Sequence, residues 1–278
     1  MNGTQKPLET VRVAALQMTS AADVGANLGI AGKLLDEAAA AGARIAVLPE
    51  NFSFMGRHDA DKRAIAERDG SGPVQDFLSA RARELKLWIV AGTTPISDSP
   101  GERVAAASLV YDDGGQRAGR YDKIHLFDVD IPGKDERYRE SGNIAPGTRM
   151  QLVPTPAGLL GLSVCYDMRF PELYRPMAAA GAQWFTVPAA FTVPTGRAHW
   201  ETLLRARAIE NLSFVVAPAQ WGQHASGRET YGDSIIIDHW GTVLGRLRSG
   251  QGIVVADLDL EAQRCVRRDF PALSHRVM

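Results

Sequence analysis

Short runs of β-forming residues alternate with stretches of helical periodicity along most of this chain. Val11–Gln17 and Ile45–Leu48 are predicted as strands on either side of a helical pattern that ends near Gly42. Trp88–Ala91 is predicted as the strand after a second helical pattern, which begins at Pro73. About a dozen such strands accompany few helices, which is more than one twisted open sheet usually carries without splitting. The pattern therefore predicts an α/β fold with two packed sheets and helices outside them.

No segment of the sequence has the character of a linker between domains. The chain has 278 residues, a length that single α/β domains reach. Asp130–Pro146 is its only extended polar stretch, and a loop of that length in a compact domain is more often a lid or a binding loop than a linker. We therefore expect one domain after a polar N-terminal tail at residues 1–10.

Charge and cysteine content exclude several classes of protein. The formal net charge of −1 lacks the basic excess of a general nucleic-acid binder. Two cysteines, Cys165 and Cys265, form neither a disulfide framework nor a paired-cysteine zinc site, and the six histidines include no HExxH motif. The apolar run Val11–Met18 is too short for a signal peptide or a membrane span. We expect a cytoplasmic protein with no metal, nucleic-acid or membrane partner, and a solvated helix face at Arg264–Arg268.

Three residues suited to chemistry are predicted at strand ends. Glu50 follows one β-rich run, Lys123 follows the second strand of a predicted hairpin, and Cys165 ends the run from Leu160 at a strand-to-helix turn. Ligands of α/β sheets gather at the carboxyl ends of strands, and a nucleophile on such a turn is presented beside backbone N–H groups. Taken singly, these residues have ordinary alternatives as a loop carboxylate, a surface lysine and a packed core thiol.

The sequence around these residues resembles the nitrilase superfamily of carbon-nitrogen hydrolases. Its three motifs match in order at residues 48–51, 121–127 and 161–172, which read LPEN, YDKIHLF and GLSVCYDMRFPE. The resemblance covers residues 11–275 and implies a single-domain α-β-β-α sandwich of mixed sheets, with the hydrolase domain at 11–262. It also implies a homodimer or larger homo-oligomer, in which a C-terminal segment at 263–278 is expected to pack on a neighbouring subunit.

The resemblance implies a role for each residue. Cys165 would be the nucleophile, Glu50 the general base and Lys123 the partner of the oxyanion, while Glu140 matches a fourth acidic position that holds the lysine or orients the substrate. A thiol is mostly protonated at neutral pH, so a base must take its proton as sulfur attacks a carbonyl. An ammonium group offsets the repulsion between base and thiolate. The implied reaction hydrolyses a small linear amide through a thioester, without a cofactor.

Further segments resemble one branch of the superfamily. Residues 195–211 are similar to the Nit branch, and residues 217–222 and 269–276 are more similar to deaminated glutathione amidases than to ω-amidases of 2-oxoglutaramate. Hydrolysis of N-carbamoyl amino acids is a further alternative. Tyr166 stands where true nitrilases usually carry tryptophan, which favours amides over nitriles. A catalytically retired metabolite-binding module with the same fold is the alternative from another class.

Several residues are expected to contact the substrate. Because the substrates of these amidases are anionic, a guanidinium group that binds a carboxylate is expected, and Arg169 and Arg197 are the candidates. Tyr166, Phe191 and Thr192 are the other predicted substrate-binding residues.

Two positions depart from the common pattern of the superfamily. Asp233 stands where a histidine is common and His239 stands where a proline is common. Neither belongs to the three catalytic residues, and Asp233 is expected to bear on pocket charge or subunit contacts rather than on reaction class. The sequence leaves open the physiological substrate, the oligomeric state and the choice between the two arginines.

Overall fold

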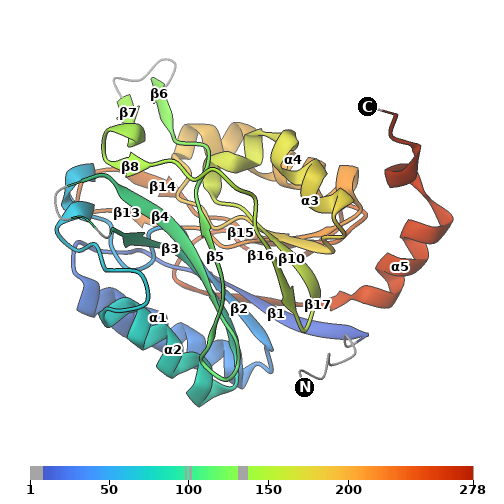
Figure 1. The fold of residues 1–278 in the computed structure, drawn as a ribbon, viewed down its shortest axis with the longest axis horizontal. Coiled ribbons are helices and arrows are strands. Elements are labelled where there is room, and N and C mark those ends of the chain that lie inside the picture. The colour runs from blue at the N-terminus through green and yellow to red at the C-terminus, as the bar shows by residue number, and fades with distance from the viewer. Residues whose placement is uncertain (1–8, 98, 100–101, 131–136, 278) are drawn as a thin grey trace.

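The computed structural model describes residues 9–97, 99, 102–130 and 137–277, and these residues form helix, sheet, sheet and helix layers (Figure 1). This part of the chain contains one seven-stranded sheet, one six-stranded sheet and two small ribbons. The arrangement confirms the predicted single-domain α/β sandwich of mixed sheets. The elements up to the middle of the chain are β1 (Thr10–Gln17), α1 (Val24–Ala40), β2 (Ile45–Leu48), α2 (Pro73–Leu85), β3 (Trp88–Ile96), β4 (Val104–Tyr111), β5 (Arg117–Asp122), β6 (Asp128–Asp130), β7 (Arg137–Arg139) and β8 (Ile144–Ala145). The later elements are β9 (Leu152–Thr155), β10 (Gly158–Leu162), α3 (Pro171–Ala179), β11 (Trp184–Thr186), α4 (Val193–Asn211), β12 (Phe214–Ala217), β13 (Trp221–Gln223), β14 (Glu229–Tyr231), β15 (Ser234–Ile237), β16 (Val243–Leu247), β17 (Gly252–Asp259) and α5 (Leu260–Asp269).

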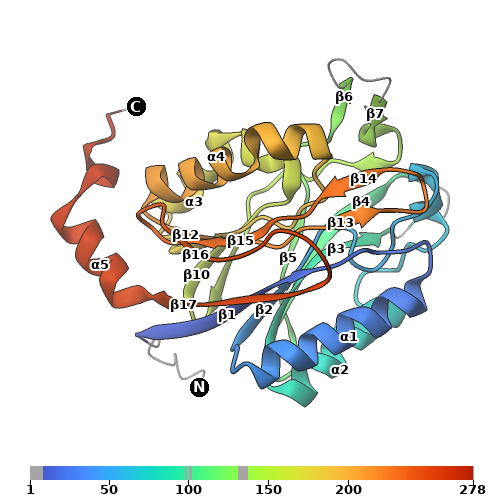
Figure 2. The ribbon, with the colours of Figure 1, turned by 180° about the vertical axis from the view of Figure 1, so that it is seen from behind.

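The two sheets share one topology. In the first sheet β1, β2 and β3 are parallel, with antiparallel neighbours β17 on one side and β4 and β5 on the other. In the second sheet β10, β11 and β12 are parallel, with antiparallel β9 on one side and β15 and β16 on the other. Helices α1 and α2 connect the parallel strands of the first sheet, and α3 and α4 connect those of the second. The helices therefore cover the outer faces, and the sheets pack against each other (Figure 2).

The central strands are buried on both faces. In β1, Val11, Val13 and Ala15 belong to the core between the sheets, whereas Ala14 and Leu16 belong to the core beneath α1 and α2. Successive side chains of a strand point to opposite faces, so both sets can be apolar only where both faces are covered. This explains why these strands are continuous apolar runs in the sequence.

The structure changes three local expectations. The periodicity of the sequence predicts a helix only from about His199 to Asn211, whereas α4 begins at Val193, and Pro194 fits its first turn. Strand β10 ends at Leu162, and Cys165 instead starts a 3-10 turn. The predicted solvated face of α5 is wrong for Arg267, which is partly buried and donates to the carbonyls of residues 182, 211 and 212. The last carbonyls of α4 have no partner within the helix, and the guanidinium group supplies one.

The ends of the chain test the predicted boundaries only in part. Residues 1–8 of the predicted tail and 131–136 of the predicted binding loop lie outside the described residues. Within the predicted C-terminal segment, Gln263 donates to the carbonyls of Gln183 and Leu212 of the same chain. Its packing on a neighbouring subunit stays a prediction. None of the helices described here is long and apolar enough to cross a membrane.

Candidate active site

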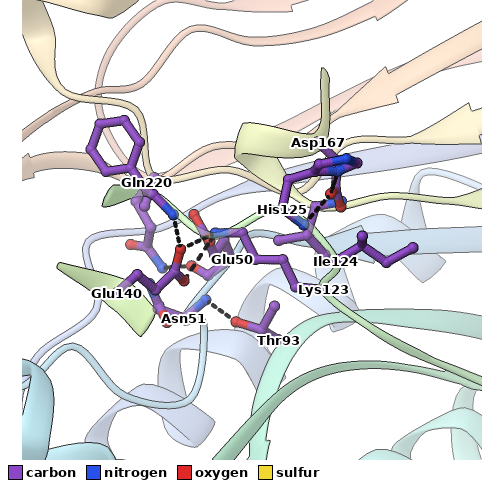
Figure 3. A network of polar contacts seen from close by, with 12 residues as sticks. Glu50, Asn51, Thr93, Lys123, Ile124, His125, Glu140, Asp167 and Gln220 are labelled. Atoms are coloured by element: carbon purple, nitrogen blue, oxygen red, sulfur yellow. Dashed lines mark hydrogen bonds and ion pairs between the residues drawn. The ribbon is translucent and has the colours of Figure 1, made fainter. Parts of the chain in front are cut away.

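Lys123 is the centre of the candidate site. Its Nζ lies 2.8 Å from Glu50 Oε1 and 3.0 and 2.9 Å from the two carboxylate oxygens of Glu140 (Figure 3). Glu50 follows β2 and Lys123 follows β5 in the first sheet, whereas Cys165 follows β10 in the second. The site therefore lies between the sheets, and the side chains of Lys123 and Glu50 are only 1% and 6% exposed.

Opposite charges hold Glu50 and Lys123 in their ionised forms. Burial by itself would raise the pKa of Glu50, but the charge of Lys123 and hydrogen bonds from Lys123 and Cys165 outweigh it and lower that pKa. Burial would likewise lower the pKa of Lys123, yet Glu140 and Glu50 raise it well above its ordinary value. The site thus presents an anionic carboxylate beside a permanently charged ammonium group at neutral pH.

Cys165 is held next to this ion pair as a protonated thiol. Burial and the charge of Glu50 raise the pKa of the thiol, and Lys123 offsets only part of that effect. The Cys165 backbone has φ +49°, and its N–H donates to Pro188 O at 2.9 Å, which ties the nucleophile turn to the end of β11. The charge of Glu50 is one of the causes of the raised thiol pKa, so this carboxylate is the group placed to take the thiol proton.

A buried carboxylate, Asp167, joins the two segments that carry Lys123 and Cys165. Its Oδ2 accepts from Val164 N–H at 2.8 Å and from the Tyr121 hydroxyl at 2.7 Å. Its Oδ1 accepts from His125 N–H at 3.0 Å and from His125 Nδ1 at 2.7 Å (Figure 3). The sequence analysis placed Asp167 in a motif without a role. Its position within the strand-to-helix turn, where a buried acid needs donors, was the available signal.

Gln220 connects the segment of Glu50 to the second sheet. It follows β12, and its Nε2 donates to Glu50 O at 3.0 Å and to Ser20 Oγ at 2.7 Å (Figure 3). Its Oε1 accepts from Ser20 N–H at 3.0 Å. The sequence analysis did not identify this residue, since nothing local distinguishes a buried glutamine that reaches across two sheets.

A pocket with about 520 Å³ of empty space opens over Cys165. It is lined by Glu50, Asn51, Asp59, Lys62, Lys123, Phe127, Tyr138, Glu140, Cys165, Tyr166, Arg169, Ala190, Phe191, Thr192, Thr195 and Arg228. The pocket brings together the predicted catalytic and substrate-binding residues with one exception. Arg197 is exposed and lines an adjoining, outer space. Lys62, Tyr138 and Arg228 were missed, because no motif connects them to the nucleophile.

Of the two candidate arginines, Arg169 is the one that lines the pocket. It lies over the rings of Tyr166 and Phe191, at 5.6 and 5.4 Å from their centroids. Both of its terminal nitrogens lie 3.3 Å from His199 Nδ1, which accepts their hydrogen bonds when that ring nitrogen carries no hydrogen. The aromatic rings fix the guanidinium plane while leaving it able to bind an anion.

The two departures from the superfamily pattern lie away from this pocket. Asp233 is buried and forms a two-pronged ion pair with Arg246, with both contacts at 2.6 Å. His239 is buried against the ring of Phe214. Neither residue is among those that line the pocket, so neither adds charge to it directly. Within the described part of the chain, no three His, Cys, Asp or Glu side chains are grouped to hold a metal ion.

Comparisons with known proteins agree with this geometry. The family profile described as Carbon-nitrogen hydrolase matches residues 12–268. A deaminated glutathione amidase of Yersinia enterocolitica is 38% identical over 269 residues, which are 96% of this chain and 93% of that protein. The NitFhit protein of C. elegans superposes with a TM-score of 0.91 at 37% identity, over 98% of this chain and 66% of that longer one. An amidase mutant of Nesterenkonia sp. AN1, described with acrylamide added to its active-site cysteine, has a TM-score of 0.78 at 26% identity, over 94% of this chain and 98% of that one. The chain belongs to the carbon-nitrogen hydrolase family, as its three motifs predicted.

Proposed function

We propose that this protein hydrolyses small anionic amides, with deaminated glutathione as the favoured substrate, and that Cys165, Glu50 and Lys123 carry the reaction. The observation that carries the proposal is the buried Glu50–Lys123 ion pair beside a protonated thiol at the base of a pocket. The similarity to deaminated glutathione amidases supports the choice of substrate.

The first step forms a bond between the sulfur and the amide carbon. Glu50 takes the thiol proton as Cys165 Sγ attacks, and the carbonyl becomes an oxyanion. The ammonium group of Lys123 has three protons, of which one serves Glu50 and another is shared by the two oxygens of Glu140, so a third is available to the oxyanion. The N–H of Tyr166, next after the nucleophile, is the expected second donor.

The second step breaks the carbon–nitrogen bond. Glu50 passes its proton to the departing nitrogen, and the acyl group remains on Cys165 as a thioester. A primary amide releases ammonia, whereas a substituted amide such as deaminated glutathione releases the amine of its peptide part. Glu50 then takes a proton from water, which attacks the thioester carbon. The carbon–sulfur bond breaks, the carboxylic acid is released, and Glu50 returns its proton to the Cys165 thiolate. Glu140 acts as a positioning residue, because it contacts Lys123 and also accepts from Phe127 N–H at 2.7 Å.

The proposal extends to assembly and location. The rings of Trp240 and Phe270 are 57% and 53% exposed and pack against each other at 5.5 Å, beside the C-terminal segment. Such a patch supports a homodimer or larger homo-oligomer in which residues 263–278 contact a neighbour. Both cysteines are free thiols, which supports a cytoplasmic setting. Sedimentation of the Phe270→Ser variant would test the assembly, since an unchanged mass would contradict this interface.

The direct test is a substrate panel with two product assays. Deaminated glutathione, 2-oxoglutaramate, an N-carbamoyl amino acid and a simple nitrile are compared by release of 2-oxoglutarate and of ammonia. We expect deaminated glutathione to give the highest kcat/KM. Tight binding without turnover of any substrate would instead indicate a retired binding module.

Cysteine variants test the nucleophile. Cys165→Ala should abolish turnover and leave the circular dichroism spectrum unchanged, because it removes only the attacking sulfur. Cys265→Ala, which alters the other thiol on α5, is the matched control and should keep the wild-type rate. Undiminished turnover in Cys165→Ala would exclude the mechanism.

A further inference from the structure

A second space, here called the outer basin, adjoins the catalytic pocket. The two spaces share Asn51, Asp59, Lys62, Tyr138 and Arg228 as lining residues. The outer basin does not include Cys165, Lys123 or Arg169 in its lining. A bound molecule that begins at the nucleophile can therefore continue past the shared residues into the outer basin.

The outer basin is rich in positive charge. Arg57, Arg137 and Arg197 line it beyond the shared residues, and Glu229 is the carboxylate among those additional residues. Arg137 lies 3.9 Å from Asp130. Among the described residues, Arg57 and Arg197 have no ion-pair or hydrogen-bond partner. Positive charges that line one concave surface attract anions to it, and the repulsion between these charges is relieved when an anion binds.

The catalytic pocket differs from the outer basin in how its positive charge is balanced. The charge of Lys123 is matched there by Glu50 and Glu140. Arg169 lines the pocket alone, whereas Lys62 and Arg228 line both the pocket and the basin. Apart from the shared residues, the pocket thus offers the guanidinium group of Arg169 and the basin offers those of Arg57, Arg137 and Arg197. An amide that reacts at Cys165 has an acyl part on one side of the scissile bond and an amine part on the other.

We propose that the outer basin is a second anion site, in which Arg57 and Arg197 bind a carboxylate on the amine side of the scissile amide. This inference rests on the proposed amide hydrolysis at Cys165. It assigns the acyl carboxylate to Arg169 in the pocket. The favoured substrates are then amides with a carboxylate on each side of the scissile bond, and primary amides with a single carboxylate are poorer.

The test compares substrates that differ only in the distal carboxylate. Deaminated glutathione, its C-terminal carboxamide and 2-oxoglutaramate are assayed with the wild type and with Arg57→Ala and Arg197→Ala. Each variant should lower kcat/KM for deaminated glutathione about tenfold, the size expected for one hydrogen bond between charged groups. The rates on the carboxamide and on 2-oxoglutaramate should stay within about twofold.

Arg205→Ala is the matched control. Arg205 lies on the same helix as Arg197 and is exposed, but it does not line the basin and pairs with Glu201 at 3.8 Å. Its rates on all three substrates should match the wild type. An equal loss on all three substrates in the Arg57 and Arg197 variants would overturn the proposal, because it would indicate a structural role.

A binding experiment separates this inference from the proposed function. Calorimetry compares the Cys165→Ala protein with the Cys165→Ala/Arg197→Ala double variant. The second substitution should weaken the binding of deaminated glutathione about tenfold and leave the binding of its carboxamide unchanged. Unchanged affinity for deaminated glutathione would overturn the second anion site even if the enzyme hydrolyses that compound. Loss of affinity in this variant would support the site even if the wild type turned over none of the amides.

Discussion

Replacing Asp167 by asparagine would test how the fold holds the nucleophile and the lysine in register. The substitution preserves size and shape but removes a buried charge and one acceptor oxygen. The Asp167 carboxylate receives donors from Val164 N–H, the Tyr121 hydroxyl, His125 N–H and His125 Nδ1. An amide group offers one acceptor oxygen and one NH₂ group, so it cannot serve both pairs of donors.

The magnitude follows from the two possible orientations of the amide. If its NH₂ group faces the Val164 side, the Tyr121 hydroxyl can turn to accept, but Val164 N–H is left without an acceptor. If it faces the His125 side, the ring can change tautomer, but His125 N–H is left without an acceptor. A buried unsatisfied donor costs about 1–3 kcal/mol, and the remaining bonds lose their charge assistance. We therefore expect Asp167→Asn to lower the free energy of unfolding by about 2–4 kcal/mol.

The catalytic effect should fall on kcat. Asp167 contacts the segments that carry Lys123 and Cys165 but does not line the pocket. In the variant we therefore expect Lys123 and Cys165 to be displaced relative to each other, while the position of Arg169 is kept. A displacement on the order of 1 Å costs about a hundredfold in rate, and we expect a loss of about ten- to a hundredfold in kcat with KM within about threefold.

Urea unfolding and steady-state kinetics measure both effects. Asp112→Asn is the matched control: Asp112 accepts from Gly114 N–H and Gln116 N–H through the same oxygen, which asparagine retains, so its cost should stay below about 0.5 kcal/mol. Tyr121→Phe removes one donor to Asp167 and also the acceptor of Ile124 N–H, which lies 3.3 Å from the hydroxyl oxygen, so it should cost about 1–3 kcal/mol. If Asp167→Asn unfolded within about 0.5 kcal/mol of wild type and kept kcat within twofold, the reasoning would be refuted.

Three further predictions concern the Glu50–Lys123 ion pair, Arg267 of the C-terminal helix and Gln220. Lys123→Met leaves the buried Glu50 and the partly buried Glu140 without their cation and should cost about 3–5 kcal/mol at pH 7.5. In the wild type the lowered pKa of Glu50 stabilises the fold above its ordinary value of 4.5, and this stability is lost as the pH falls through the folded value. In the variant burial should raise that pKa, so urea unfolding should show greater stability at pH 5 than at pH 7.5, and the opposite trend would contradict the assignment. Arg267→Ala should lower the free energy of unfolding by about 1–3 kcal/mol without changing kcat, whereas exposed Arg268→Ala should lower it by less than about 0.5 kcal/mol in the same thermal unfolding assay. Gln220→Ala should reduce kcat about tenfold with KM nearly unchanged in steady-state kinetics. A rise in KM with kcat unchanged would contradict its positioning role.

Local sequence was sufficient to predict most elements of the fold. The bounds of β2 match the predicted strand at Ile45–Leu48, because an apolar run with β-branched residues is a local property of the sequence. The start of α4 at Val193 was missed, since its first turn carries no strong apolar periodicity. Arg267 was misread for a related reason, because the carbonyls that it meets come from a distant part of the chain.

The sequence by itself determined which chemical groups this protein has, through three ordered motifs that contain Glu50, Lys123 and Cys165. Only the tertiary structure decided how they meet. The packing of the two sheets places Cys165 against the Glu50–Lys123 pair, and it brings Glu140 to the same ammonium group. It also places Arg169 inside the pocket and leaves Arg197 outside it. The physical reason is that these contacts join residues far apart in the chain, whose distances depend on sheet packing and burial rather than on local periodicity.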